Sequence, residues 1–268
     1  MIAVANRISE DFERVGQFWR FVGRAFVVSF FSCFRPSIYP LVLTQMFIIG
    51  VRSLPVIMIT GAFVGMTLAV QAFDQLASLG IEERLGALIN VSGVNELGPV
   101  LAAVMLAGRV GGALTAELGT MKVTEQIEAV KSMGVDPVQH LVAPRILACL
   151  LLAPILIIYA DLLCSLGGYF VSVNYLGISG RPYWDYSASI VELWDVAIGI
   201  VKGFFFGAAI AVISCYKGFH SENGAHGVGK ACTEAFVLSF ISILALDFML
   251  VVIFKAIYNT IWPLKSIF

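Results

Sequence analysis

Charge is what this sequence lacks most. Only 13% of its 268 residues are charged, whereas 59% are hydrophobic, and the mean hydropathy is +0.90. An ordinary soluble domain carries roughly 25% charged and about 45–50% apolar residues. A soluble globule with so little charge would expose apolar patches larger than soluble monomers tolerate. The composition therefore excludes a soluble protein and predicts an integral membrane protein whose excess apolar surface faces lipid.

Several kinds of functional site are missing as well. The balance of 17 basic and 18 acidic residues excludes the basic footprint of a nucleic-acid-binding protein. The five cysteines form no CxxC pair and the three histidines lack metal-ligand spacing, so we expect no metal site. The stretch Gly224–Lys230 fits GxxxxGK, but Ala231 follows it where a phosphate-binding loop needs Ser or Thr. We therefore expect no catalytic residue and no bound ATP in this chain.

What the sequence has in abundance is long apolar runs. A bilayer core about 30 Å thick needs about 20 predominantly apolar residues per helix. The runs predict an all-α polytopic membrane protein with five transmembrane helices, which form one domain over residues 51–260. We place the spans at about residues 53–73, 91–114, 141–173, 196–216 and 235–254.

The first fifty residues have a different pattern and form a separate N-terminal region, residues 1–50. Residues 11–34 place apolar side chains at helical spacing between arginines, which is typical of a helix lying in the membrane interface. The apolar residues are Phe12, Val15, Trp19, Val22 and Phe26, and the arginines are Arg14, Arg20 and Arg24. Residues 38–51 are apolar but too short for a span, so they suit an interfacial or re-entrant segment. The alternative is that both pieces form a sixth span, against which Pro36 and Pro40 argue.

Lysine and arginine predict the orientation, because loops rich in these residues stay in the cytoplasm. Five arginines lie in the N-terminal region, and the connections over residues 115–140 and 217–234 hold two lysines each. The opposite loops hold only Arg84 and Arg181. We therefore expect a cytoplasmic N-terminus and, after five spans, a periplasmic C-terminus.

Three ionisable residues inside the spans are candidates for a substrate cavity. Glu96, Lys202 and Asp247 lie on three different spans at similar depth in the outer half of the membrane. Charges there are costly, so they must pair with one another or line a wet cavity. The alternative is a pairing network that only locks the helices together. Asp161 is a fourth buried charge, for which no partner is predicted.

The polar connection between spans two and three is the most informative loop. Thr124 followed by residues 125–133 predicts a short helix, which Gly134 and then Asp136-Pro137 terminate. A short cytoplasmic helix held between two spans is suited to transmit a push from a soluble partner. The alternative is a solvated connector without such a role.

About fifty residues of this region carry a family resemblance. Residues 95–145 closely resemble the signature of MlaE/YrbE-type permeases of ABC lipid transporters, and the likeness extends over roughly residues 50–255. Glu128-Ala129-Val130, with Gly134 four residues later, is also similar to the coupling loop of ABC importers. The structural residues of the motif are Gly98, Pro99, Gly108, Arg109, Gly112 and Glu117.

The resemblance implies a homodimer of five-span subunits with N-terminal interfacial helices. It implies that a separate ABC ATPase, which uses ATP and magnesium, receives the short helix. A periplasmic MCE-domain protein and a STAS-domain protein are the other implied partners, and phospholipid is the implied substrate. The family's buried charges map onto Glu96, Lys202 and Asp247, whereas Asn95 departs from relatives that have arginine there. The coupling helix is implied to include Thr124, Glu125, Glu128, Ala129 and Gly134.

The resulting prediction is a permease subunit, not an enzyme, in the bacterial inner membrane. It would move phospholipid between the inner and outer membranes. An ABC permease for another hydrophobic substrate, such as a sterol, is an alternative. A proton-coupled secondary carrier is another, but such carriers usually show two related halves, and this sequence shows no such repeat. A purely structural membrane subunit would need neither the charged cluster nor the short helix.

Overall fold

A computed structural model describes the backbone of residues 2–33 and 35–261, with their side chains except those of residues 2–12, 14, 15, 37 and 261. The described residues contain helices and no strand. The helices are α1 (Ile2–Ser32), η1 (Pro36–Ile38), α2 (Tyr39–Ser78), η2 (Glu82–Arg84), α3 (Leu85–Ser92), η3 (Gly93–Leu97), α4 (Gly98–Leu106), η4 (Ala107–Gly111), α5 (Gly112–Val123), α6 (Gln126–Ser132), η5 (Val138–Val142), α7 (Ala143–Asn174), α8 (Gly180–Ile190), α9 (Leu193–Phe219) and α10 (Gly224–Ile261).

Five helical segments are long and apolar enough to span a membrane, which confirms the predicted number. Each contains one predicted span and extends beyond it at both ends. The second segment is continuous from η2 to α5, and two π-helical turns, η3 and η4, interrupt its α-helical pattern. The five segments are Tyr39–Ser78, Glu82–Val123, Val138–Asn174, Leu193–Phe219 and Gly224–Thr260.

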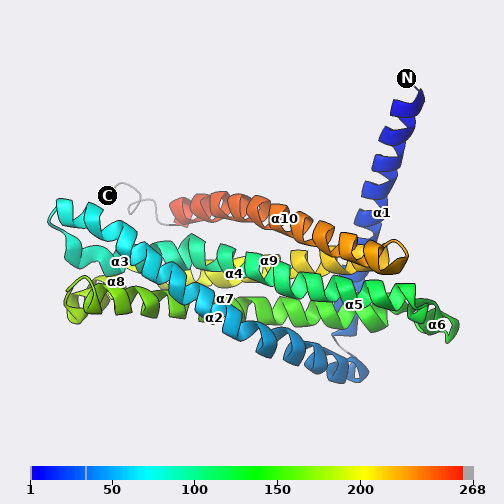
Figure 1. Ribbon diagram of the computed structural model, residues 1–268, viewed down its shortest axis with the longest axis horizontal. Helices are drawn as coiled ribbons and strands as arrows, with labels where there is room; N and C mark the ends of the chain where they lie inside the picture. The colour runs from blue at the N-terminus through cyan, green and yellow to red at the C-terminus, as the bar shows by residue number, and fades with distance from the viewer. Residues whose placement is uncertain (1, 34, 262–268) are drawn as a thin grey trace.

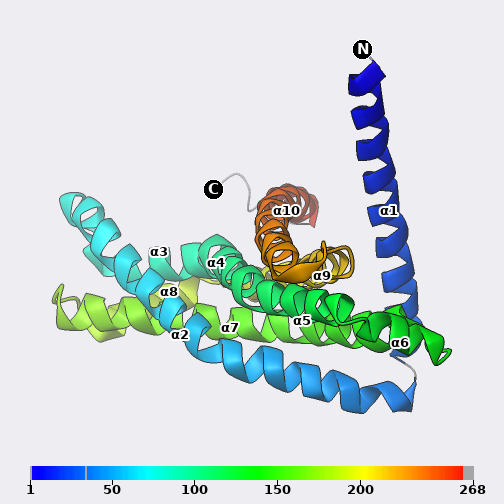
Figure 2. The same ribbon diagram turned by 45° about the vertical axis from the view of Figure 1, so that its right-hand side comes forward.

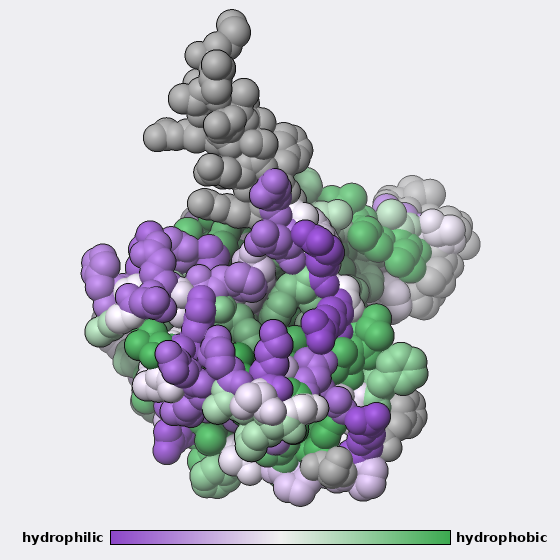
Figure 3. Space-filling model, turned by 90° about the vertical axis from the view of Figure 1, so that its right-hand side faces the viewer, coloured by the Kyte–Doolittle hydropathy of each residue, from purple (hydrophilic) through white to green (hydrophobic). Residues whose placement is uncertain are grey.

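The spans form a bundle around α7. Helix α7 packs against α2 on one side and α9 on the other, and α9 in turn contacts α5 and α10. Figures 1 and 2 show the spans running lengthwise, whereas α1 stands across them at the end of the bundle that carries α6. Viewed from that end, hydrophilic side chains cover much of the surface and hydrophobic ones gather toward its margin (Figure 3). The α6 end is therefore suited to face water.

Glycines at four-residue spacing let these helices approach closely. A Cβ on Gly61 or Gly65 of α2 would meet the backbone of α7 at Ala160 or Cys164. A Cβ on Gly203 or Gly207 of α9 would meet α7 on its other face. Small residues at this spacing allow such close backbone contact between membrane helices.

Gly65→Ala is expected to lower the free energy of unfolding by about 1–3 kcal/mol, the usual cost of overpacking a core. The added methyl group would overlap the carbonyl oxygen of Cys164, so α2 and α7 must separate. Gly23→Ala on α1 is the matched control, because a Cβ there meets nothing within 4 Å. Thermal unfolding of the purified protein checks both. Equal melting temperatures for the two variants would contradict the packing account.

The segment 38–51 differs from its expected form. It is neither a separate interfacial piece nor part of a sixth span, because residues 39–51 are the first turns of the 40-residue helix α2. The prolines do break the chain where expected, since Pro36 lies in η1 and Pro40 takes the first turn of α2. Proline is tolerated in a first turn, where its missing N–H has no partner to lose. Pro40 therefore begins the helix of the first span.

Helix α1 is a single helix, as the arginine-containing pattern predicted. Its inner face packs Ala25 and the partly buried Phe18 and Phe21 against the bundle. Trp19 and Phe26, two residues of the predicted apolar stripe, are exposed on another face. An interfacial helix needs such an outward apolar face to enter lipid. The side chains of Phe12, Arg14 and Val15, which belonged to the same prediction, lie outside the described set.

Candidate functional site

Lys202 is the centre of the charged cluster. Its side chain on α9 is fully buried, and its Nζ lies 2.7 Å from Oδ1 of Asp247 on α10. The same Nζ donates a hydrogen bond of 2.8 Å to the backbone carbonyl of Asn95 in η3. A buried ammonium is stable only with such partners, because desolvation of an unpaired charge costs several kcal/mol. Lys202 therefore joins three spans at one point.

Pro99 explains why a carbonyl is available to Lys202. In an α-helix the carbonyl of residue 95 would accept from the N–H of residue 99, and proline has no N–H. The resulting gap lies within the π-helical turn η3, a type of turn that is frequent at functional sites. Lys202 fills it from the neighbouring helix. The role of Pro99 in the motif is therefore to free the carbonyl of Asn95.

Glu96 lines a pocket together with Lys202, but among the described ion pairs Lys202 contacts Asp247 and not Glu96. The pocket has a volume of about 370 Å³ and opens at the end of the bundle opposite α6, between α9, α10 and η3. Glu96 is exposed there. The pocket is also lined by polar and aromatic side chains that were not predicted from the sequence. They are Glu192, Trp194, Asp195, Lys255 and Tyr258.

Asp161 of α7 lies beside the same π-helical turn. Its buried Oδ1 has no hydrogen-bond partner among the described residues. A Cβ on Gly98 would overlap this oxygen, and a Cβ on Gly199 would lie 3.8 Å from Oδ2. Gly98 and Gly199 therefore make room for the carboxyl group between the second and fourth spans. This packing is the reason that the motif has glycine at position 98.

Pro99→Ala is expected to reduce transport several-fold while changing the free energy of unfolding by less than about 1.5 kcal/mol, the net size of one hydrogen bond. Alanine supplies an N–H that competes for the carbonyl of Asn95, so Lys202 loses one of its two partners. Pro55→Ala in α2 is the control, because this proline lies on another span and is exposed. A transport assay and a melting curve check both variants. Normal transport by Pro99→Ala would show that the carbonyl contact is dispensable.

The predicted short helix exists as α6, which lies at the same end of the bundle as α1 (Figure 1). Ile127 is its one buried residue, whereas Glu128 and Ala129 are exposed to solvent. Gly134 ends it as predicted, with a φ of +77° that glycine adopts without strain. A hydrogen bond of 3.3 Å from the N–H of Val135 to the carbonyl of Val130 closes this end.

Thr124 and Glu125 do not begin α6 as the sequence indicated. The hydroxyl of Thr124 donates to the carbonyl of Thr120 at 2.8 Å, so this residue completes α5. Glu125 follows in the left-handed region, with a φ of +57°. The chain thus turns sharply between the two helices, and α6 starts one residue later, at Gln126.

Two ion pairs tie the α6 region to the rest of the bundle. Arg24 of α1 contacts Asp136, just after α6, at 3.0 Å. Glu117 of α5 contacts Arg145 of α7 at 2.7 Å, and Arg145 is buried. A displacement of α6 would therefore act on α1, α5 and α7 together.

The remaining motif residues lie on the second span. Gly108 faces α10, where an added Cβ would lie 3.4 Å from the ring of Phe236. Arg109 is exposed although it lies inside the span, and a Cβ on Gly112 would meet nothing within 4 Å. A charge exposed on the surface of a span needs a protein or water partner. This face of the second span is therefore suited to contact another subunit or an aqueous cavity.

Comparison with known proteins gives consistent matches. A family model described as "Permease MlaE" matches residues 42–253. A probable ABC transporter permease protein of Rickettsia felis is 37% identical over 258 residues, which are 95% of this chain and 98% of that protein. The intermembrane phospholipid transport system permease protein MlaE of Haemophilus influenzae is 35% identical over 255 residues, 93% and 98% of the two chains. The chloroplastic TRIGALACTOSYLDIACYLGLYCEROL 1 protein of Arabidopsis thaliana is 35% identical over 201 residues, 75% and 57%.

Proposed function

Because this chain belongs to the MlaE family of ABC transporter permeases, we propose that it moves phospholipids between the inner and outer membranes of a bacterium. A separate ATPase subunit drives the transport. The observation that carries the proposal is the buried Lys202–Asp247 pair beside an open pocket at the end of the bundle away from α6. Such a pocket combines fixed charges with the aromatic side chains of Trp194 and Tyr258. This mixture suits a molecule with a polar headgroup and acyl chains.

We propose that two copies of the chain form the working permease. Helices α2 and α10 are the least enclosed spans. In their most apolar stretches of 18 residues only 22% and 17% of the residues are buried, whereas about half are buried in the other three spans. Arg109 on the second span also needs a partner from outside the chain. A second copy would cover these faces and enclose a cavity for acyl chains between the first, second and fifth spans.

The proposed orientation places the α6 end in the cytoplasm. Helix α1, helix α6 and the α9–α10 turn lie at one end of the bundle (Figure 1). These are the three regions that the distribution of lysine and arginine assigns to the cytoplasm. The fifth span then leads to the periplasmic side, although residues 262–268 at the C-terminus lie outside the described range.

The proposed mechanism begins at α6. Closure of the ATPase subunits pushes the two α6 helices toward each other, and the ion pairs of Arg24 and Glu117 pass the movement to α1, α5 and α7. The spans then squeeze the cavity, which lowers its affinity for lipid. ATP supplies the difference in free energy between the two states, without which no net shift of lipid would occur.

Co-purification tests this function most simply. Affinity capture of the tagged chain from its own membranes should recover an ABC ATPase, an MCE-domain protein and bound phospholipid, with a STAS-domain protein as a further partner. Mass spectrometry identifies all of them. Capture without an ATPase, or with a sterol as the bound lipid, would contradict the proposal in its partner or its substrate.

A further inference from the structure

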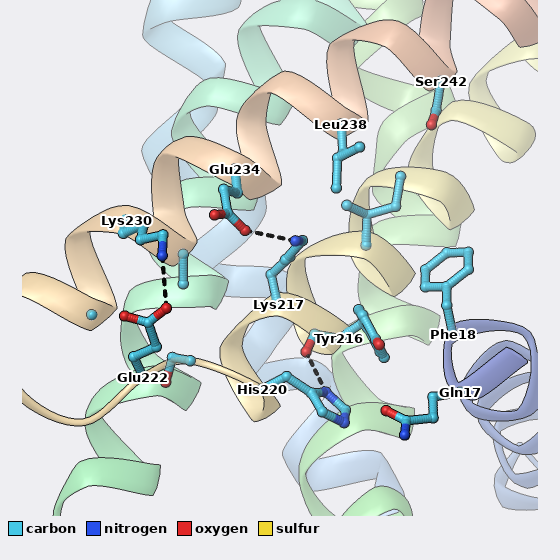
Figure 4. A pocket seen from close by; sticks show the side chains of 14 residues that line it. Gln17, Phe18, Tyr216, Lys217, His220, Glu222, Lys230, Glu234, Leu238 and Ser242 are labelled. Carbon is cyan, nitrogen blue, oxygen red and sulfur yellow. Dashed lines mark hydrogen bonds and ion pairs between the residues drawn. The ribbon is translucent and has the colours of Figure 1, made fainter. Parts of the chain in front are cut away.

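A larger pocket lies at the α6 end of the bundle, away from the Lys202 site. Its volume is about 680 Å³, and it forms a groove between α1, the last turns of α9 and the first half of α10. Figure 4 shows its charged side chains at one end and Leu238 and Ser242 farther along α10. The proposed transport mechanism makes no use of this groove.

The charged end of the groove contains two ion pairs, whose charges cancel. Lys217 contacts Glu234 at 2.7 Å, and Lys230 contacts Glu222 at 2.7 Å (Figure 4). The Lys230 ammonium, which donates a hydrogen bond to Glu222, holds the pKa of that carboxyl below its usual range. His220 lies next to them, with Nδ1 2.8 Å from the carbonyl of Tyr216. Both signs of charge are thus presented at one place.

Away from the charged end the groove is mainly apolar, apart from Gln17 and Ser242, and it follows the membrane-spanning direction. Phe18 of α1, Ile213 of α9 and Leu238 of α10 line it. From Lys230 to Ser242 it follows twelve residues of α10, which is about 18 Å of helix. A soluble protein docking at the end of the bundle could not follow a groove that extends this far along a span. An acyl chain can.

Helix α1 forms one wall of the groove through aromatic contacts. The rings of Phe18 and Phe21 lie 5.0 and 5.5 Å from the ring of Tyr216, both edge-on. The groove therefore lies where helix α1 packs against the fourth span, and these ring contacts fix the position of its wall. A ligand in it would contact α1, α9 and α10 together.

We propose that this groove binds one zwitterionic phospholipid from the leaflet on the α6 side. The phosphate takes the ammonium of Lys217, the positive group of the headgroup takes the carboxylate of Glu234, and one acyl chain lies along Leu238. A zwitterion satisfies both partners of an opened ion pair, whereas an anionic headgroup leaves a carboxylate without a cation. The site is independent of the proposed transport, because this groove and the Lys202 pocket lie at opposite ends of the bundle.

Native mass spectrometry of the purified complex tests the site, with phosphatidylethanolamine and phosphatidylglycerol as probes. Lys217→Ala is expected to weaken binding of phosphatidylethanolamine about tenfold, the usual effect of losing a charge-assisted hydrogen bond. Leu238→Trp should weaken it similarly by filling the apolar part. Glu234→Gln should reverse the preference toward phosphatidylglycerol, because the groove then carries a net positive charge. Arg181→Ala on α8, at the other end of the bundle, is the matched control and should bind like the unaltered protein.

The double variant Lys217→Ala/Glu234→Ala guards against misfolding, because it leaves no unpaired charge and should still lose the lipid. A photoreactive residue at position 238 should form an adduct with phospholipid. Unchanged lipid binding in the Lys217, Leu238 and double variants would overturn the proposal, as would an adduct with a protein. If the groove binds lipid but the complex transports none, this site stands and the proposed function fails.

Discussion

Lys202→Met is expected to abolish phospholipid transport and to lower the free energy of unfolding by about 3–5 kcal/mol, the usual cost of removing one partner of a buried ion pair. The substitution keeps the length of the side chain but leaves the carboxylate of Asp247 and the carbonyl of Asn95 without their donor. Melting curves and a transport assay measure the two effects. Glu96→Gln is the control for stability, because Glu96 is exposed and takes part in none of the ion pairs among the described residues.

The double variant Lys202→Met/Asp247→Leu separates a functional cluster from a helix lock. It removes both charges, so the penalty of an unpaired buried charge disappears and stability should recover except for the cost of the unpaired carbonyl of Asn95, about 1–3 kcal/mol. If the charges act on the substrate, transport stays absent in the double variant even though its stability is partly restored. Recovery of both stability and transport would show that the pair only holds the helices together.

Gly134→Val is expected to uncouple ATP hydrolysis from transport, with transport falling about tenfold while the ATPase stays bound. A β-branched residue at a φ of +77° costs about 1–3 kcal/mol, so the chain would leave this conformation and move the end of α6. A shift of 1.4 kcal/mol is a tenfold change in an equilibrium. Glu128→Lys should act similarly by reversing an exposed charge on the face that we propose contacts the ATPase.

Gly134→Asn is the matched control, because asparagine tolerates the left-handed region far better than valine. It should keep most of the transport activity. ATP hydrolysis, lipid content and transport are measured on the same reconstituted complex, and lipid binding should be unchanged in all three variants. Full ATP-driven transport by Gly134→Val or Glu128→Lys with the ATPase still bound would show that α6 is not the coupling element.

The number of spans could be predicted because each apolar run is long enough to cross the bilayer as a helix. The start of the first span could not, since Pro36 and Pro40 look like breaks when only neighbouring residues are considered. The structure places Pro40 in a first turn and accommodates Pro55 inside the helix. Thr124 was assigned to the wrong helix, because its hydroxyl donates back to the carbonyl of Thr120 in α5 and the sequence does not reveal which of the two helices it caps.

The charged site was predicted in part, because charges within apolar runs are rare enough to be compared by depth. That comparison brought together Lys202 and Asp247, which are 2.7 Å apart. The contact with the carbonyl of Asn95 was not predicted, although Pro99, which has no N–H to donate to the fourth preceding carbonyl, is a local signal for it. The pairing of this carbonyl with Lys202 depends on how two helices rotate about their axes, which spacing alone does not determine. Arg24 and Asp136, 112 residues apart, gave no local signal at all.

Reconstitution tests the central claim most directly. The chain, with its proposed ATPase and MCE-domain partners, is placed in liposomes that contain labelled phospholipid, and transfer to acceptor membranes is followed with and without ATP. Transfer should depend on ATP, disappear in Lys202→Met and in Lys202→Met/Asp247→Leu, and continue in Gly134→Asn. Transfer that proceeds equally without ATP, or that persists in the double variant with partly restored stability, would contradict the account.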